Sequence, residues 1–437
     1  MSIFTLALNS VSRCLREITK ISYAPRRIGP GRVSNASRES CDADTSGHGS
    51  SFSSAATAQT TEIYRVVGYR RVMSQPSPEV YERGKGMDAH NQVMREIRAK
   101  KDKQYDPHEP TRVWLDEDNT PDGVVQSLTI ILNTGGCRWA RAGGCTMCGY
   151  VAESVEGGSV THDALMDQID VCLEHEAENA DEPADLIKIY TSGSFLDERE
   201  VGAETRQAIA ETFADRERIV VESLPDFVER AKIADFTDEG ISTDVAIGLE
   251  TATDRVRHDC VNKYFDFADF EAACAEARDA DIEADGCDVG VKAYLLMKPP
   301  FLSESEAIED MVSSVRRCAD VDGCHTVSMN PTNVQRYTMV DDLFFRGGYR
   351  PPWLWSVAAV LERTADIDAI VVSDPVGHGS DRGPHNCGEC DDRVQKAIKD
   401  FDKRQDPTVF EQVSCECEAT WEYVVEAETS YGMPLNR

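Results

Sequence analysis

Apolar runs of strand length alternate with helical patterns along the chain after residue 125. The helical patterns occupy residues 161–178, 200–214, 226–236, 265–280 and 304–319, and a sixth spans Trp353–Thr364. The apolar runs are Gln126–Leu132, Leu186–Tyr190, Arg218–Val221, Asp244–Leu249, Val289–Met297, Thr326–Met329 and Ile367–Val372. Repeated βα units with short connections predict an α/β protein with a parallel sheet covered by helices.

The helix over residues 304–319 has the clearest start signal. Ser303 and Glu306 have the spacing of a capping box, and Ile308, Met311 and Val315 fall on one helical face. Six βα units predict a partial (βα)6 barrel, although the pattern alone also permits a doubly wound sheet. In either architecture ligands bind at the carboxyl ends of the strands, so we expect functional residues directly after each strand.

Composition divides the chain into four segments. Residues 1–72 carry ten basic and five acidic residues, and residues 34–61 are rich in Ser, Ala and Gly with little to bury. We expect a disordered leader there, or a segment upstream of a true start at Met73. Residues 73–125 are expected to form an N-terminal helical segment, with a polar helix over Asp88–Lys103. The barrel would then span residues 126–373, followed by a small C-terminal Cys/His segment over 374–437.

Charge and cysteine usage indicate the environment of the protein. The 78 acidic and 46 basic residues give a net charge of -32, and the basic residues are 33 Arg and only 13 Lys. Such chains suit cytosols with molar salt, where the screening length falls to about 3 Å at 1 M, so we interpret the protein as halophilic. Fifteen scattered cysteines do not resemble a secreted disulfide pattern. No apolar run is long enough for a membrane span, and we expect a cytoplasmic protein.

A glycine-rich loop after the first of these strands holds three cysteines. Cys137, Cys145 and Cys148 have the spacing C-x7-C-x2-C. A structural zinc site or an inert iron–sulfur cluster normally takes four protein ligands, so three cysteines leave one metal position open for a substrate or cofactor. A zinc knuckle with a distant fourth ligand, or a disulfide, is the alternative interpretation.

The run GGCRWARAGGCTMCGY over residues 135–150 resembles the radical S-adenosylmethionine (SAM) superfamily. There, three cysteines after the first barrel strand hold a [4Fe-4S] cluster, and SAM chelates the fourth iron. The x7 gap departs from the commonest C-x3-C form. More narrowly, the run resembles the archaeosine-biosynthesis radical SAM family (RaSEA), a relative of the Elp3/MiaB-type domains. The resemblance implies a partial (βα)6 radical SAM barrel and favours it over the doubly wound sheet.

Several residues at strand ends are candidates for binding SAM. Residues 191–194, with Ser192, Gly193 and Ser194, stand where the superfamily has a turn that binds the amino group of SAM, although any tight βα turn uses such residues. Glu222 and Glu250 each place a carboxylate at the mouth of the barrel, where they could contact ribose or ammonium groups. A salt bridge to a neighbouring Lys or Arg is the alternative for both.

The last strands end in amides and a lysine. Lys298 could meet a carboxylate of SAM or substrate, or pair with a surface acid. Asn330, Asn333 and Gln335 lie in the run NPTNVQ, which also resembles RaSEA, and their amides suit a modified purine or an amino-acid moiety. We assign Asn330 to the cofactor site.

Two later segments have more than one interpretation. Residues 344–355 interleave aromatic residues with Arg346 and Arg350, which would suit stacking on RNA bases, but packing in the core is the more common role. The C-terminal segment contains a run HNCGEC over 385–390 that again resembles RaSEA. Cys387 and Cys390, completed by two of the other candidates, would form a zinc site or hold an auxiliary cluster; a redox pair or plain loop residues remain possible. The other candidates are His378, His385, Cys415 and Cys417.

The family resemblance implies a reaction and partners. The enzyme would cleave SAM at the cluster to give methionine and a 5'-deoxyadenosyl radical, which would abstract hydrogen from a lysine adduct of 7-cyano-7-deazaguanine in tRNA. Cleavage of the lysine C–N bond would leave archaeosine. The expected partners are tRNA, an ArcS-type transferase that attaches the lysine, and an electron donor such as ferredoxin. A methylthiotransferase and a non-catalytic zinc or iron–sulfur RNA-binding protein are the alternatives.

Overall fold

The computed structural model describes residues 88–99, 105–150, 154–155 and 159–428. All of these belong to one compact unit, Arg70–Arg437. The proposed leader at 1–72 and the proposed start at Met73 lie outside the described residues.

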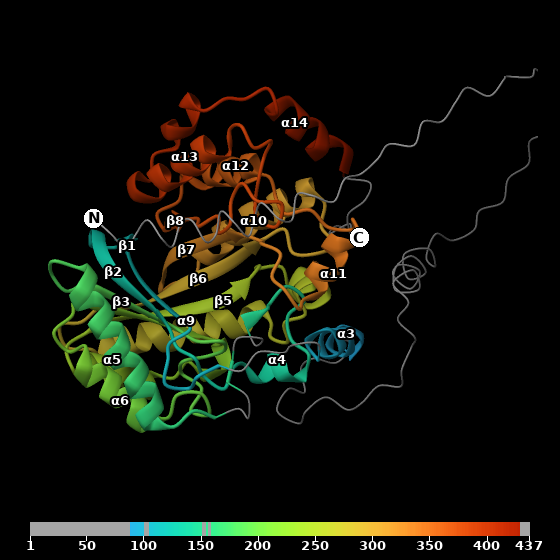
Figure 1. Ribbon diagram of the computed structural model, residues 1–437. Coiled ribbons are helices and arrows are strands. Elements are labelled where there is room, and N and C mark those ends of the chain that lie inside the picture. Colours follow the sequence, from blue (N-terminus) through green and yellow to red (C-terminus); the bar gives the residue numbers. More distant parts are fainter. Residues whose placement is uncertain (1–87, 100–104, 151–153, 156–158, 429–437) are drawn as a thin grey trace, which may run out of the picture. The chain divides into compact units, whose positions relative to one another are not determined.

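One sheet of eight strands organises this unit, with the strands in sequence order (Figure 1). Strand β1 pairs antiparallel with β2, and every later pair is parallel. The sheet curls into an open half-barrel, so the predicted α/β partial barrel is confirmed. The strands are β1 (Arg112–Thr120), β2 (Gly123–Ile131), β3 (Leu186–Tyr190), β4 (Arg218–Ser223), β5 (Ser242–Glu250), β6 (Val289–Met297), β7 (Cys324–Pro331) and β8 (Ile370–Val372).

The six predicted helices are all present and join consecutive strands of the sheet. The Ser303 capping box is formed in both directions, with the Ser303 side chain accepting from the Glu306 amide. Three cysteines that lie within these helices, Cys172, Cys274 and Cys318, are fully buried. The helices are α5 (His162–Asn179), α6 (Ala203–Thr212), α7 (Arg230–Thr237), α9 (Phe267–Glu283), α10 (Glu304–Ala319) and α12 (Leu354–Thr364).

Alternation along the strands gives the sheet two different faces. In β3, Ile187 and Ile189 pack in the main hydrophobic core with the covering helices, whereas Lys188 and Tyr190 line a cavity on the other face. Successive strand residues point to opposite faces, so a strand with ionisable residues at alternate positions places all of them on the same side. The inner face of this half-barrel is therefore polar.

The first strand, β1, was missed by the sequence analysis. The segment 73–125 was expected to be helical, but after helix α3 (Asp88–Arg98) the chain forms a β1–β2 hairpin around Pro121 and Asp122. Gly123 has φ +121°, a conformation that favours glycine. The charged run over 116–118 concealed the strand, because Asp116 and Asp118 line the polar cavity and leave no apolar alternation in this part of the sequence. The helical assignment of this segment was therefore wrong beyond α3.

The remaining α-helices lie in the cysteine loop, after β5, after β7 and after β8, and the sequence patterns did not include them. They are α4 (Arg138–Ala142), α8 (Asp254–Val256), α11 (Met339–Phe345), α13 (Asp391–Arg404) and α14 (Glu418–Ala427). The first three are short and α13 is strongly charged, so their apolar patterns are weak. Among the described residues, no helix combines the length and the apolar character needed to cross a membrane.

Candidate active site

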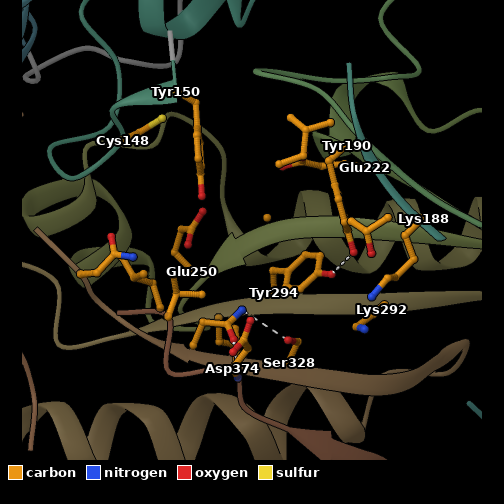
Figure 2. Close-up of a pocket in the computed structure, with 18 of the residues that line it drawn as sticks. Cys148, Tyr150, Lys188, Tyr190, Glu222, Glu250, Lys292, Tyr294, Ser328 and Asp374 are labelled. Atoms are coloured by element: carbon orange, nitrogen blue, oxygen red, sulfur yellow. Dashed lines mark hydrogen bonds between the residues drawn. The ribbon is translucent and has the colours of Figure 1, made fainter. Parts of the chain in front are cut away.

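A cavity of about 560 Å³ opens at the carboxyl ends of the strands. Its wall includes the three cysteines of the loop after β2 and seven other predicted site residues: Ser192, Gly193, Glu222, Glu250, Asn330, Asn333 and Gln335. Figure 2 shows Cys148, Glu222 and Glu250 around this space. Tyr190 and Tyr294 lie between these residues and Lys188 and Lys292. The fold thus brings together residues that are nearly 200 positions apart in the sequence.

The long gap between Cys137 and Cys145 is filled by helix α4. Trp139 in this helix is buried, donates from Nε1 to the Asn262 carbonyl oxygen at 2.7 Å and lies against the ring of Tyr264. Gly143 has φ +143°, and a side chain there would meet Asn91 at 2.3 Å. The x7 spacing is therefore a folded insertion, held by one large aromatic residue and a glycine that no other residue could replace without strain.

Helix α3 fastens the cysteine loop from outside the barrel. Arg98 donates to the carbonyl oxygens of Ala140 at 2.6 Å and of Cys148 at 2.7 Å. Asn91 accepts from the Gly144 amide at 3.1 Å and from the Asn262 side chain at 2.9 Å. The sequence did not indicate that Asn91 and Arg98 support the cysteine loop, because both lie on a mostly polar helix. Most of their partners are backbone groups that come close only when the chain folds.

The donor set of the loop fits a cluster better than a single ion. Each cysteine of a cubane cluster bonds a different iron, so their sulfur atoms lie farther apart than around one ion. The only described group of three or more ligands that could hold one ion lies elsewhere in the chain, which argues against the zinc-knuckle interpretation for this loop. Burial raises the pKa of Cys137 to about 12 and also raises the pKa of Cys145 and Cys148. Three buried thiolates therefore need a cationic partner such as iron.

The turn after β3 is built around a buried carboxylate that the sequence analysis missed. Glu200 accepts from Thr134 Oγ1 at 2.8 Å and from the Ser194 amide at 3.0 Å, and burial raises its pKa to about 7. A Cβ atom on Gly193 would lie 1.9 Å from Glu200 Oε1 and 2.7 Å from the Cys137 Cα. The Ser194 hydroxyl accepts from the Leu224 amide at 3.0 Å. This turn is therefore tied to the cysteine loop and cannot widen.

The two predicted carboxylates at the mouth differ in their partners. Glu250 has φ +68° and forms an ion pair with Lys263 at 2.6 Å, which is the salt-bridge alternative considered above. Glu222 forms no ion pair with any described residue, and burial raises its pKa to about 8. A neutral carboxyl group can donate as well as accept a hydrogen bond. Contacts of either residue with SAM stay predictions.

The predicted amides occupy the opposite side of the mouth. Asn330 accepts from the Asp374 amide at 3.1 Å and donates to Ser328 Oγ at 3.3 Å. Gln335 accepts from the Gly149 amide at 2.6 Å, directly after the last cysteine of the loop. Asn333 also lines the cavity. These amides thus join the loop after β7 to the cysteine loop and to the end of β8.

Lys298 does not reach the cavity. Its ammonium group forms a buried ion pair with Glu304 at 2.5 Å, so neither alternative proposed for it, a ligand carboxylate or a surface acid, is correct. Glu304 also accepts from the Trp353 amide at 2.8 Å.

The aromatic segment over 344–355 divides into two parts. Trp353 and Trp355 are buried, and Arg350 lies over the Trp353 ring at 4.1 Å, so packing explains this part. Phe345 is 74% exposed, and Arg382 lies 5.5 Å from the ring centres of both Phe344 and Phe345. Only this exposed part remains a candidate for stacking on bases.

Four cysteine sulfurs form a second, separate group in the C-terminal segment. Cys387, Cys390, Cys415 and Cys417 have sulfur atoms within 4.8 Å of one another, with three separations of 3.6 to 3.8 Å. Metal–sulfur bonds of about 2.3 Å give a tetrahedron with edges of about 3.8 Å. This four-cysteine group therefore matches a single tetrahedral ion.

The surroundings of this group also suit metal-bound thiolates. Cys390 and Cys417 directly precede helices α13 and α14, where backbone amides favour negative charge. Hydrogen bonds from the amides of Glu389 and Cys390 lower the pKa of Cys387 to about 7, whereas burial raises the pKa of Cys390 and Cys417, which would therefore need the charge of a metal ion to ionise. Trp355 Nε1 donates to Cys417 Sγ at 3.3 Å. The four-cysteine group thus ties both helices to α12.

The two candidate histidines are not part of this group. His378 contacts Asp392 at 3.3 Å, and His385 contacts the Gly383 carbonyl oxygen at 2.8 Å. The later cysteines, not the histidines, therefore complete the set of four.

Comparisons with known proteins agree with this geometry. The chain is 38% identical over 354 residues to archaeosine synthase subunit beta of Methanosarcina acetivorans, covering 79% of this chain and 99% of the relative. It is 39% identical over 324 residues to archaeosine synthase subunit beta of Thermococcus kodakarensis, covering 72% and 96%. No protein-family model matches the sequence.

Two solved structures resemble the fold weakly. Elp3 of Methanocaldococcus infernus has a TM-score of 0.41 at 14% identity, over 54% of this chain and 58% of that one. A queuine lyase from Clostridium spiroforme, bound to SAM and queuine, has a TM-score of 0.35 at 16% identity, over 50% and 80%.

A curled half-barrel with a three-cysteine loop after its first parallel strand defines a radical SAM enzyme. The extent of the match to full-length relatives then decides the family. The chain belongs to the archaeosine synthase subunit beta family.

Proposed function

We propose that this protein modifies tRNA by converting a lysine adduct of 7-cyano-7-deazaguanine to archaeosine through radical cleavage of a C–N bond. The observation that carries the proposal is the 38% identity to an archaeosine synthase beta subunit over 99% of its length, together with the three-cysteine loop at the cavity. Bound there, a [4Fe-4S] cluster and SAM would supply the radical chemistry that this reaction requires.

The cavity residues would bind and orient the cofactor. Cys137, Cys145 and Cys148 would hold three irons, and the narrow turn at Ser192 and Gly193 would present backbone carbonyls to the amino group of SAM. Glu222 and Glu250 face the same space and would bind hydroxyl or ammonium groups. Asn330 would complete the cofactor site from the opposite side of the mouth. The buried walls would exclude water and oxygen from the reacting atoms.

Recognition of tRNA would rely on local contacts, since a net charge of -32 repels RNA at long range. The pair of Arg382 with Phe344 and Phe345 offers one exposed stacking surface. The subunit name of the relatives supports a partner protein, for which an ArcS-type transferase that attaches the lysine is the proposal. Reduction of the cluster would need an electron donor such as ferredoxin.

The decisive experiment uses anaerobically reconstituted full-length protein and tRNA carrying the lysine adduct. We expect the electron paramagnetic resonance signal of the reduced cluster to shift on addition of SAM. 5'-Deoxyadenosine and archaeosine should then form in equal amounts. SAM cleavage without archaeosine would refute the substrate, and a cluster that does not respond to SAM would refute the enzyme class.

We further propose that the four-cysteine group binds zinc in a structural role. Four protein ligands leave no open position, unlike the three-cysteine loop. A single ion also disfavours the methylthiotransferase alternative, which would need an auxiliary cluster to carry sulfur. Elemental analysis of the reconstituted protein should give one zinc beside four irons. A total near eight irons without zinc would overturn this assignment.

A further inference from the structure

The cavity continues below the cofactor residues into the barrel. Tyr190 on β3 and Tyr294 on β6 face each other there, with their hydroxyl oxygens 2.5 Å apart (Figure 2). Lys188 and Lys292 lie two residues earlier on the same strands and also line the cavity. Because residues two apart share a face, the lysines form the layer directly below the tyrosines.

Most charges in this deeper layer have partners. Lys188 forms an ion pair with Asp118, and Asp244 is shared by Arg218 at 3.0 Å and His325 at 2.9 Å. Asp118 and Asp244 thus each have a cationic partner in this layer, and Lys292 takes part in none of these ion pairs.

The ammonium group of Lys292 is the exception. It forms no hydrogen bond or ion pair with any described residue and instead lies 5.5 Å from the centre of the Tyr294 ring. Burial lowers its pKa, although the charges of Asp118, Asp244 and Asp402, none of which it contacts, oppose the shift. An unpaired charge in such a place costs folding free energy, so its position calls for an anionic ligand.

Two carboxylates on the neighbouring wall of the cavity, Asp374 and Asp402, lack a cationic partner among the residues that the structure describes, just as Lys292 lacks an anionic one. Asp374 follows β8, and its carboxylate makes no hydrogen bond or ion pair with the described part of the chain. Asp402 on α13 accepts from the Ser373 amide at 2.9 Å, and burial, together with the charge of Asp374, raises its pKa. Burial also raises the pKa of Asp374, although Lys399 lies near enough to oppose the shift. Two adjacent carboxyl groups that resist ionisation call for a cationic ligand.

We propose that Lys292 binds the carboxylate, and the pair Asp374 and Asp402 the ammonium group, of an α-amino-acid moiety on the substrate. This inference rests on the proposed function and deepens it: the amino-acid end of the lysine adduct points into the barrel. The nucleoside end then lies toward Trp114 and Tyr150, exposed aromatic residues of the cavity lining. The lysine side chain between the two ends passes the level of the tyrosine pair.

Binding of small analogues to the reconstituted full-length protein tests the subsite without turnover. The probes are Nε-acetyl-L-lysine, N-acetylcadaverine, which lacks the carboxylate, and 6-acetamidohexanoate, which lacks the α-ammonium group. We expect each truncated probe to bind about 10- to 100-fold more weakly than Nε-acetyl-L-lysine in calorimetric titrations. Equal affinities, or no saturable binding of Nε-acetyl-L-lysine, would overturn the proposal.

Variants assign each half of the subsite. Lys292→Met should lower the affinity for Nε-acetyl-L-lysine to that of N-acetylcadaverine and leave N-acetylcadaverine unchanged. Asp402→Asn, which keeps an acceptor for the Ser373 amide, should remove the preference for the α-ammonium group. Lys396→Met removes an exposed lysine from the same helix as Asp402 and should change nothing. Loss of affinity for all probes in Lys292→Met would contradict a specific role in carboxylate binding.

Two further outcomes separate this subsite from its neighbours. SAM carries the same amino-acid group, so Nε-acetyl-L-lysine must still bind when SAM is saturating, and mutual exclusion would overturn the proposal. If the probe binds as described but lysine-modified tRNA is not converted, the proposed function fails and the subsite stands. If Lys292→Met converts modified tRNA with an unchanged KM, the subsite fails and the function stands.

Discussion

The protein contains two cysteine groups, and they differ in how well the spacing of the cysteines in sequence predicts the arrangement of their sulfur atoms. The three cysteines of the loop after β2 lie within twelve residues of sequence and line one cavity, yet their sulfurs do not form a group that could hold a single ion. The four C-terminal cysteines come from two pairs more than twenty residues apart, yet their sulfurs gather within 4.8 Å. Closeness in sequence therefore does not decide closeness in space. It is the backbone around each group that decides between a cluster site and a single-ion site.

The two groups also differ in what supports them. The loop is braced by α3, α4 and a buried carboxylate, and it has one wall open to the cavity. The four-cysteine group lies between α12, α13 and α14, with side chains donating to the sulfurs of Cys390 and Cys417, and Cys387 is exposed to solvent. A site that must admit a cofactor needs a wall open to a cavity, whereas a site that joins helices needs only ligands from each of them.

The largest expected effect comes from removing a loop cysteine. Cys145→Ala should reduce SAM cleavage by on the order of 1,000-fold or more, because the cofactor supplies the chemistry and one of its three protein ligands is lost. The measurement is 5'-deoxyadenosine formation with dithionite, beside an iron count. Cys172→Ala removes a buried cysteine outside both cysteine groups and should retain full iron content. An active, iron-replete Cys145→Ala would contradict the assignment of the loop.

Removing a cysteine from the second group should affect stability and spare the chemistry. Cys390→Ser should release the bound ion and lower Tm by about 5–10 °C, since loss of a metal site costs roughly 3 kcal/mol or more. Hydrogen exchange should accelerate in α13 and α14, because both begin at this group. SAM cleavage at low temperature should persist. Should cleavage vanish while iron and fold are intact, the four-cysteine group would have a catalytic role.

A smaller effect is expected from the turn that joins the cofactor site to the loop. Gly193→Ala places a methyl group against Glu200 and the Cys137 backbone, so the turn must shift. We expect the affinity for SAM to fall by about tenfold with the cluster retained, as for the loss of one or two good hydrogen bonds. Gly202→Ala is the matched control, because its added methyl would meet nothing closer than 4.0 Å. Equal SAM affinities of the two variants would exclude a positioning role for the turn.

The smallest effect concerns Glu222 and pH. Its pKa is about 8 in the folded protein against 4.5 ordinarily, because it is buried. Between these values the folded state holds a proton that the unfolded state has lost, so this residue makes the free energy of unfolding decrease as pH rises. Glu222→Gln lacks this contribution, and the Tm of the variant should rise relative to the parent from pH 5 to pH 8. The exposed Glu198→Gln should show no such trend, and a parallel Tm profile for Glu222→Gln would contradict the burial argument.

Sequence periodicity predicted the parallel strands and their covering helices well, with β3 and β6 at the bounds that the structure shows, because alternation and capping are local signals. It failed at β1, where charged residues face a polar barrel interior and give no apolar pattern. It also failed for Lys298, whose partner Glu304 is six residues away but is selected by burial rather than by spacing.

By itself, the sequence determined the α/β class and singled out the three loop cysteines and several of the residues that line the cavity, because these lie on or beside regular elements with a local periodicity. Only the tertiary structure decided that Cys415 and Cys417, not the histidines, join Cys387 and Cys390. It alone showed Glu200 beneath the Gly193 turn and Lys292 without a partner among the described residues. Such facts depend on which groups from distant segments share one small volume, and that is fixed by packing rather than by local preference.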